Sequence, residues 1–153
     1  MASITVVTDL CSPPGLLWPL ILDFDRQSEW LHGHERYVTE PPSAPVEGAS
    51  FVQRGSLKGV SGTVEWTIET LEPVRLLELS GAAPMGLRLA ARFEFVPDGP
   101  GTQVICRYDV HGPRMIGMLV RAGHGTAHRH TTTSLARLDV LAQTSRLRLP
   151  QIA

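Results

Sequence analysis

The sequence has few cysteines and no long apolar run, and these two absences exclude several classes of protein. Only two of the 153 residues are cysteines. Cys11 and Cys106 lie far apart and follow no metal-binding or redox spacing, so we expect a reducing compartment and no disulfide framework. The most apolar window, Leu16 to Leu22, is short and contains Pro19, and the first residues lack the regions of a signal peptide. We therefore expect a cytoplasmic protein that does not insert into a membrane.

The chain also lacks an excess of charge of either sign. Its net charge is -1, and the 14 basic residues are arginines apart from Lys58. They are scattered among acidic residues, whereas a protein that binds nucleic acid gathers them into a basic strip. We expect no nucleic-acid partner. The sequence leaves the oligomeric state open, with a homodimer as one alternative.

The motifs of several common enzyme classes are missing as well. There is no Gly-x-Ser-x-Gly nucleophile elbow, no glycine-rich phosphate loop between a strand and a helix, and no recognisable cysteine–histidine arrangement. His124 and His128 are four residues apart, but no glutamate follows the first histidine and no third ligand is evident. The sequence thus predicts no cofactor, no nucleotide and no metal ion.

What the sequence does contain is a series of strand-like segments between two helical ends. Ser3 to Thr8 alternates in β-branched residues, and Ser12-Pro13-Pro14 then opens a helix that runs to about Phe24. A second short helix or a turn is expected around Arg26 to Leu31. The strand-like segments that follow are 36–39, 50–55, 59–71, 75–79, 87–96 and 102–111.

The pattern within these segments predicts an α+β fold with one curved antiparallel sheet. Short turns join the strands, and parallel neighbours would need a crossover helix after each strand. Val64, Trp66 and Ile68 alternate with polar residues, as do the apolar residues of 87–96 and 102–111, so one face of the sheet is dry. We expect a single domain at 1–146 and a tail at 147–153.

The stretch from Arg114 to Arg146 predicts one long helix that closes this sheet. Its first half offers little hydrocarbon between Gly123 and Thr131, so a sheet that covers it would leave unfilled space. Unfilled space inside a fold is where ligands bind. We therefore expect a cavity along the opening turns of this helix. With about 100° between successive residues, its core-facing side comprises Ile116, Val120, His124, Ala127, Thr131, Ser134, Leu135 and Leu138.

Taken in order, several short segments resemble a known superfamily. They are Pro13-Pro14 with Leu17-Trp18-Pro19-Leu20, Asp23-Phe24 with Trp30, Gly48 to Phe51, Trp66 to Pro73, Gly101 to Val104 and Ser134 to Leu138. Their order and spacing are similar to those of the START-related, birch-pollen-allergen-like (SRPBCC) superfamily, and within it of polyketide cyclase/dehydratase-like proteins. The resemblance implies a helix-grip fold, in which a seven-stranded sheet grips the C-terminal helix around a deep apolar cavity. It implies no single activity, because members include carriers, receptors, cyclases and hydrolytic enzymes.

Three residues are candidates for catalysis. His124 lies on the core-facing side of the long helix, where a neutral imidazole can move a proton near pH 7; the alternative is a structural histidine that only hydrogen-bonds. Tyr37 and Tyr108 can orient a carbonyl group. The resemblance supports Tyr37, because related cyclases have a tyrosine seven residues after the tryptophan that matches Trp30. They also use an arginine after the second tryptophan, which this chain lacks.

The function predicted from the sequence is the binding of a hydrophobic small molecule, polyketide-like or lipid-like. The enzymatic hypothesis is cyclisation or dehydration of a polyketide-type intermediate, with His124 as acid and base and Tyr37 or Tyr108 orienting a carbonyl. The alternative is a carrier or sensor that leaves its ligand unchanged. The predicted ligand-binding residues are Trp30, Phe51, Gln53, Trp66, Leu89, Ala91, Phe93, Met115, Met118, Val120, Ala127, His128 and Thr131.

Overall fold

A computed structural model describes residues 2–57, 60–114, 118 and 121–147. Most strands lie in the middle of the chain, and the two α-helices lie nearer its ends. The elements are β1 (Ala2–Leu10), α1 (Pro14–Leu22), the 3-10 helix η1 (Phe24–Glu29), β2 (His34–Tyr37), β3 (Ser50–Leu57), β4 (Val60–Glu72), β5 (Leu76–Ala82), the short 3-10 helix η2 (Pro84–Gly86), β6 (Arg88–Asp98), β7 (Gly101–His111) and α3 (His124–Leu147).

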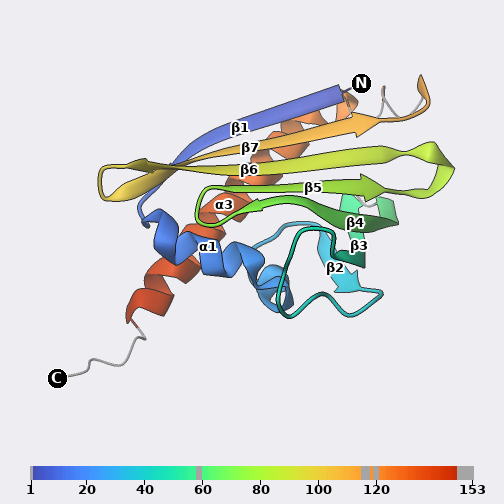
Figure 1. Ribbon diagram of the computed structural model, residues 1–153. Helices are drawn as coiled ribbons and strands as arrows, with labels where there is room; N and C mark the ends of the chain where they lie inside the picture. Colours follow the sequence, from blue (N-terminus) through green and yellow to red (C-terminus); the bar gives the residue numbers. More distant parts are fainter. Residues whose placement is uncertain (1, 58–59, 115–117, 119–120, 148–153) are drawn as a thin grey trace.

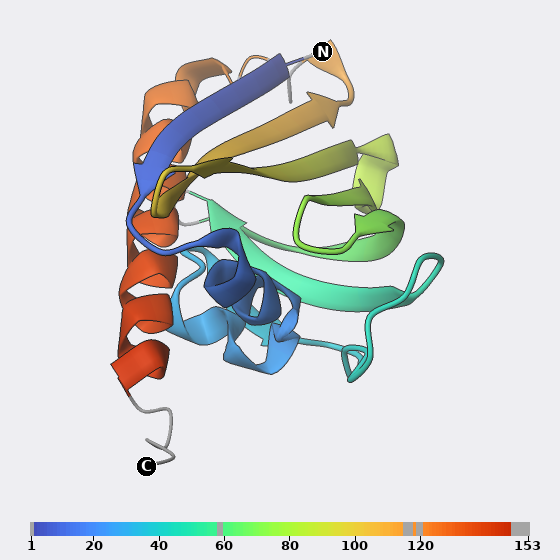
Figure 2. The same cartoon turned by 60° about the vertical axis from the view of Figure 1, so that its left-hand side comes forward.

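The strands form one seven-stranded sheet in the order β1-β7-β6-β5-β4-β3-β2. Every neighbouring pair is antiparallel. Two elements, α1 and η1, carry the chain from β1 at one edge to β2 at the other. The sheet curls, α3 runs across it, and α1 and η1 lie at one end of the curl (Figures 1 and 2). The predicted α+β helix-grip fold is confirmed.

Alternation along the strands accounts for the dry inner face. Ile68, Leu77, Phe95 and Val104 are at most 1% exposed. The register places such residues opposite one another, as where Phe93 pairs with Leu77 on one side and a buried cysteine on the other. Because successive side chains point to opposite faces, one register fixes a whole apolar layer.

The second half of α3 docks on β1 and α1. Leu135, Leu138 and Ala142 are fully buried there. The Asp139 carboxylate accepts hydrogen bonds from the backbone amides of Cys11 (2.8 Å) and Ser12 (3.0 Å). Burial raises the pKa of Asp139, but these hydrogen bonds outweigh it and hold the pKa below its usual value. Helix α3 is thereby fastened to the turn between β1 and α1.

The prediction of one unbroken helix from Arg114 to Arg146 is wrong at Gly123. This residue is a turn, and the continuous helix α3 begins at His124 and ends at Leu147. Glycine in a helix costs about 1 kcal/mol relative to alanine, which favours an interruption at this position. The Gly123 carbonyl accepts a hydrogen bond from the amide of Ala127 (2.9 Å) and so closes the first turn of α3. Among the described residues, no helix combines the length and apolarity needed to cross a membrane.

Candidate ligand pocket

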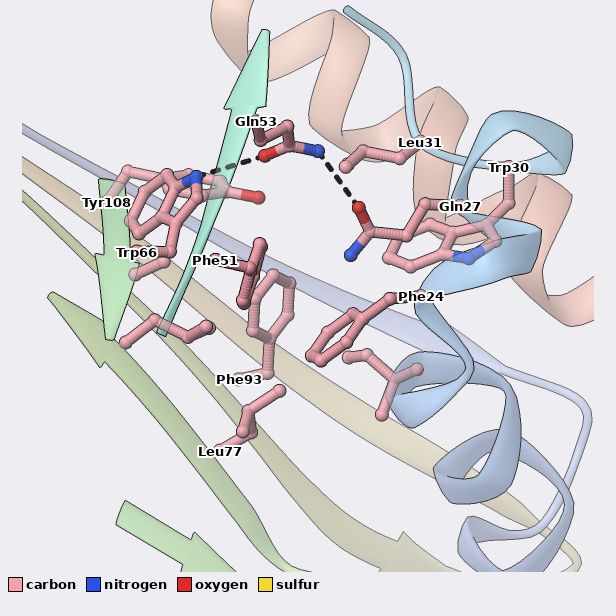
Figure 3. A pocket seen from close by; sticks show the side chains of 13 residues that line it. Phe24, Gln27, Trp30, Leu31, Phe51, Gln53, Trp66, Leu77, Phe93 and Tyr108 are labelled. Carbon is pink, nitrogen blue, oxygen red and sulfur yellow. Dashed lines mark hydrogen bonds between the residues drawn. The ribbon is translucent and has the colours of Figure 1, made fainter. Parts of the chain in front are cut away.

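A pocket lies between the inner face of the sheet and the segment formed by α1 and η1. Its interior offers about 70 Å³ to the centre of a water-sized molecule, which is room for several waters or a small organic group. The side chains converge on it from both walls (Figure 3). They are Ile21, Phe24, Gln27, Trp30, Leu31, Phe51, Gln53, Trp66, Leu77, Leu79, Ala91, Phe93 and Tyr108.

Aromatic rings make up much of the wall. The rings of Phe24 on η1 and Phe51 on β3 lie 4.8 Å apart between centroids. Those of Phe93 and Tyr108 meet edge to face at 6.0 Å and 90°. Rigid rings in these arrangements present flat apolar surfaces, so the pocket suits a planar, hydrophobic guest.

Trp66 reaches the pocket because its neighbour across the sheet is a glycine. Gly81 on β5 pairs with Trp66 on β4. A Cβ atom at Gly81 would lie 2.7 Å from Val64 Cγ1 and 2.9 Å from the Trp66 ring. Real Cβ atoms do not approach so closely, so Gly81 provides the space in which the indole packs.

A hydrogen-bonded network of side chains crosses one end of the pocket. Trp66 Nε1 donates to Gln53 Oε1 (2.9 Å), and Gln53 Nε2 donates to Gln27 Oε1 (2.9 Å). Two of these links are drawn in Figure 3. The Tyr37 hydroxyl lies 2.6 Å from Gln27 Oε1 and 2.8 Å from the backbone carbonyl oxygen of Phe24, and these two acceptors share its single hydrogen. The network therefore ties η1 to three strands of the sheet.

His34 completes this network as an acceptor. Burial lowers the pKa of His34, which favours the neutral imidazole. Its Nδ1 lies 2.6 Å from Gln53 Nε2. An amide nitrogen can only donate, so Nδ1 accepts and the imidazole proton resides on Nε2.

The two tyrosines that were predicted as catalytic residues occupy different positions. Tyr108 lines the pocket, and its hydroxyl points into it (Figure 3). Burial raises the pKa of Tyr108 well above its ordinary value, so the hydroxyl stays protonated. Tyr37 lies behind Gln27; burial, followed by the charges of Asp25 and Asp23, raises its pKa as well.

A buried thiol lies on the same strand as Tyr108. Cys106 is fully buried, and burial raises its pKa to about 12. A thiol is nucleophilic as the thiolate, so Cys106 is a small core residue rather than a nucleophile. No described lining residue is a carboxylate, a histidine, a lysine or an arginine.

The structure brings together seven of the predicted site residues. These come from η1's C-terminal end and from β3, β4, β6 and β7, and they surround one space although they are far apart in the chain. Their roles in binding stay predictions. The seven are Trp30, Phe51, Gln53, Trp66, Ala91, Phe93 and Tyr108.

The prediction that His124 points inward is wrong. His124 is exposed at the first residue of α3. No side chain between His124 and Thr131 is fully buried, because α3 makes its main contacts with β1 and α1 further along the helix. The pocket accordingly lies under η1 rather than along the opening turns of α3, and no described residue of α3 lines it.

Other predicted ligand-binding residues also lie outside the pocket. His128 is exposed, Leu89 and Thr131 are half-buried, and Met118 is 68% exposed. Ala127 is half-buried and packs against the core. His130 is half-buried, and its ring centroid lies 3.6 Å from that of His32. Met115 and Val120 fall outside the described residues.

Six lining residues were missed in the sequence. Gln27 is the most important chemically, because its amide reaches the pocket. Phe24, Gln27 and Leu31 recur at spacings of three and four, a pattern that places them on one face of a helical turn. This spacing was the available signal. The remaining three, Ile21, Leu77 and Leu79, have the pattern of ordinary core residues.

Comparisons with known proteins give a consistent family. A model of the family described as "Polyketide cyclase / dehydrase and lipid transport" matches residues 1–141. In Mycobacterium tuberculosis, the protein named Toxin Rv0910 is 28% identical over 127 residues, which is 80% of this chain and 87% of that protein. The uncharacterized protein Rv1546 of the same organism is 24% identical over 78% of this chain and 83% of its own length.

Solved structures share the fold at low identity. The Zhui aromatase/cyclase from Streptomyces sp. R1128 has a TM-score of 0.74 and 15% identity, with 97% of this chain and 96% of that chain covered. Ara h 8.0201 has a TM-score of 0.65 and 8% identity, with 94% and 98% covered. The predicted resemblance is thus confirmed, and the chain belongs to the polyketide cyclase/dehydrase and lipid transport family.

Proposed function

We propose that this chain binds an uncharged hydrophobic small molecule, polyketide-like or lipid-like, in the pocket between the sheet and η1. The observation that carries the proposal is the pocket's lining of aromatic and aliphatic side chains with only a few polar groups, all of them neutral. Such a lining favours apolar ligands and disfavours ions, whose burial is costly without a partner.

The second candidate is cyclisation or dehydration of a polyketide-type intermediate. The family description and the fold shared with an aromatase/cyclase favour it. General acid–base catalysis works best with groups that titrate near the operating pH. The described lining residues offer Tyr108, whose pKa is well above neutral, and no carboxylate or imidazole. Binding without turnover, as in a carrier or sensor, is therefore the better supported function.

The test compares two substitutions of adjacent alanines on β6. Ala91 faces the pocket and is 4% exposed, whereas Ala90 lies on the outer face and is exposed. Ala91→Leu adds three carbon atoms to the cavity, and Ala90→Leu adds the same atoms outside it. Two of the three tryptophans, Trp30 and Trp66, line the pocket, so their fluorescence reports a guest.

We expect the small apolar probe indane to change the tryptophan fluorescence of the wild type and of Ala90→Leu with the same affinity. Its affinity for Ala91→Leu should be at least tenfold lower than for the wild type. Equal affinity for all three proteins would contradict the proposal. Native mass spectrometry of protein isolated from its own host would then identify a retained compound. Recovery of that compound in chemically altered form after incubation would favour the enzymatic candidate over the carrier.

A further inference from the structure

The orientation of the Gln27 side chain is dictated by a tryptophan two hydrogen bonds away. The indole N–H of Trp66 can only donate, so the group that faces it at 2.9 Å must be the Gln53 oxygen. The Gln53 nitrogen then faces Gln27, also at 2.9 Å, and requires an oxygen there. Donor and acceptor logic thus fixes which end of each amide points where.

The Gln27 amide nitrogen is consequently directed away from this network. Its oxygen already accepts from Gln53 and from the Tyr37 hydroxyl. Figure 3 shows the nitrogen on the pocket side of the side chain. Gln27 is only 8% exposed, and among the residues that the structure describes its nitrogen has no acceptor. The two hydrogens of this nitrogen are therefore available to an oxygen atom of a guest in the pocket.

Tyr108 can supply a second donor from another wall, because its partner in the folded protein is the Cys106 thiol, a weak acceptor that a carbonyl oxygen can replace. Tyr108 stands on β7, whereas Gln27 stands on η1, and its hydroxyl points into the same cavity (Figure 3). Because both side chains line the same pocket, we expect a polar group held between them to reach both donors. A carbonyl oxygen has two lone pairs and can accept from both.

We propose that Gln27 and Tyr108 together bind the carbonyl oxygen of a neutral ligand whose apolar part packs against Phe24, Phe51 and Phe93. This specificity rests on the proposed function, because it assigns the ligand class for that pocket. A carboxylate fits less well, since no described lining residue carries a positive charge to balance it. An ammonium group fits less well because the Gln27 amide nitrogen presents hydrogens rather than lone pairs.

The first experiment uses 1-indanone and indane, which share a bicyclic frame and differ in one carbonyl group. Tyr108→Phe removes a single hydroxyl and keeps the ring. We expect it to weaken 1-indanone binding about fivefold to tenfold, the usual effect of one hydrogen bond, and to leave indane binding within about twofold. The affinity is read from tryptophan fluorescence.

The second experiment reverses the chemistry of Gln27. Gln27→Glu keeps an oxygen that faces Gln53 and Tyr37 but turns the pocket-facing nitrogen into an oxygen. We expect this variant to lose the preference for 1-indanone over indane. It should also bind the cationic probe 1-aminoindane at least tenfold more tightly than the wild type does. Gln103→Glu, which adds the same charge on β7 away from the pocket lining, is the control and should match the wild type.

The outcomes separate this inference from the proposed function. If neither probe binds the wild type, the pocket takes no apolar guest and both proposals are overturned. If both probes bind but either Tyr108→Phe or Gln27→Glu leaves the ratio of the two affinities unchanged, the two-donor site is overturned while the hydrophobic pocket stands. Thermal unfolding followed by circular dichroism establishes that each variant is folded, and Tyr108→Phe alone suffices as a test if Gln27→Glu does not fold.

Discussion

The inner face of the sheet is covered differently by its two helical partners. Where α3 meets β1 and α1, Leu135, Leu138 and Ala142 are fully buried in ordinary close packing. Where η1 faces the sheet, rings such as Phe24 and Phe51 border the pocket. The aliphatic side chains of α3 pack closely, whereas hydrogen bonds between side chains such as Gln27 and Gln53 hold η1 over the sheet beside the pocket. One sheet thus supports a tight core at one end and a pocket at the other.

The largest effect is expected from weakening the α3 side. Leu138 is completely buried, and Leu138→Ala should lower the free energy of unfolding by about 3 kcal/mol, because it removes buried carbon and leaves a cavity. Val140→Ala, at a position that is 60% exposed, is the matched control. Urea denaturation measures both. If Leu138→Ala lowered the free energy of unfolding by less than about 1 kcal/mol, the interface between α3 and the sheet would not be the closely packed part of the core.

A smaller effect is expected at the polar fastening of α3. Asp139→Asn replaces one accepting oxygen with a donor that faces the amides of Cys11 and Ser12. We expect a loss of about 2 kcal/mol in the free energy of unfolding at pH 7. Asp98→Asn, at an exposed position, should have little effect.

The same carboxylate gives a pH dependence with a defined sign. The pKa of Asp139 is lowered in the folded protein, so its stabilising contribution is present above the unfolded value of about 3.9. It is lost as the pH falls through the lower folded pKa. The difference in stability between wild type and Asp139→Asn should therefore shrink on acidification below about pH 4. A difference that grows on acidification would show that the carboxylate is not stabilised in this way.

The smallest effect is expected on the pocket side. Tyr37→Phe removes the hydroxyl that bonds to Gln27 and to the Phe24 carbonyl, at a cost of about 1 kcal/mol. Because the lost bonds hold η1, hydrogen exchange should accelerate at the amides of η1 more than at those of α3. Equal acceleration in both elements would contradict the separation of the two sides.

The sequence was sufficient for the fold because the alternation in the strands is local. Val64, Trp66 and Ile68 sort by period two, and the buried positions Leu135 and Leu138 follow the period of a helix. The glycine at position 123 was a signal for a break in the helix, but the effect of that break depended on where α3 packs against the sheet. That placement is a property of the assembled core.

The site was only half predictable for the same reason. Phe51, Phe93 and Tyr108 were found because strand alternation shows which side chains face inward. The position of the cavity could not be predicted in this way. It depends on how η1 is held over the sheet by hydrogen bonds between residues far apart in the chain, such as that between Gln27 and Gln53. His124 was placed inward because its helical phase matches Leu135, yet its side chain is exposed in the structure.

The most direct test of the account is to locate a bound guest by nuclear magnetic resonance. With indane and isotopically labelled protein, intermolecular nuclear Overhauser effects should connect the probe to the ring protons of Phe51 and Phe93 and to the methyl group of Ala91. Contacts confined to the opening turns of α3, such as the methyl group of Ala127, would place the guest elsewhere and contradict a pocket between η1 and the sheet.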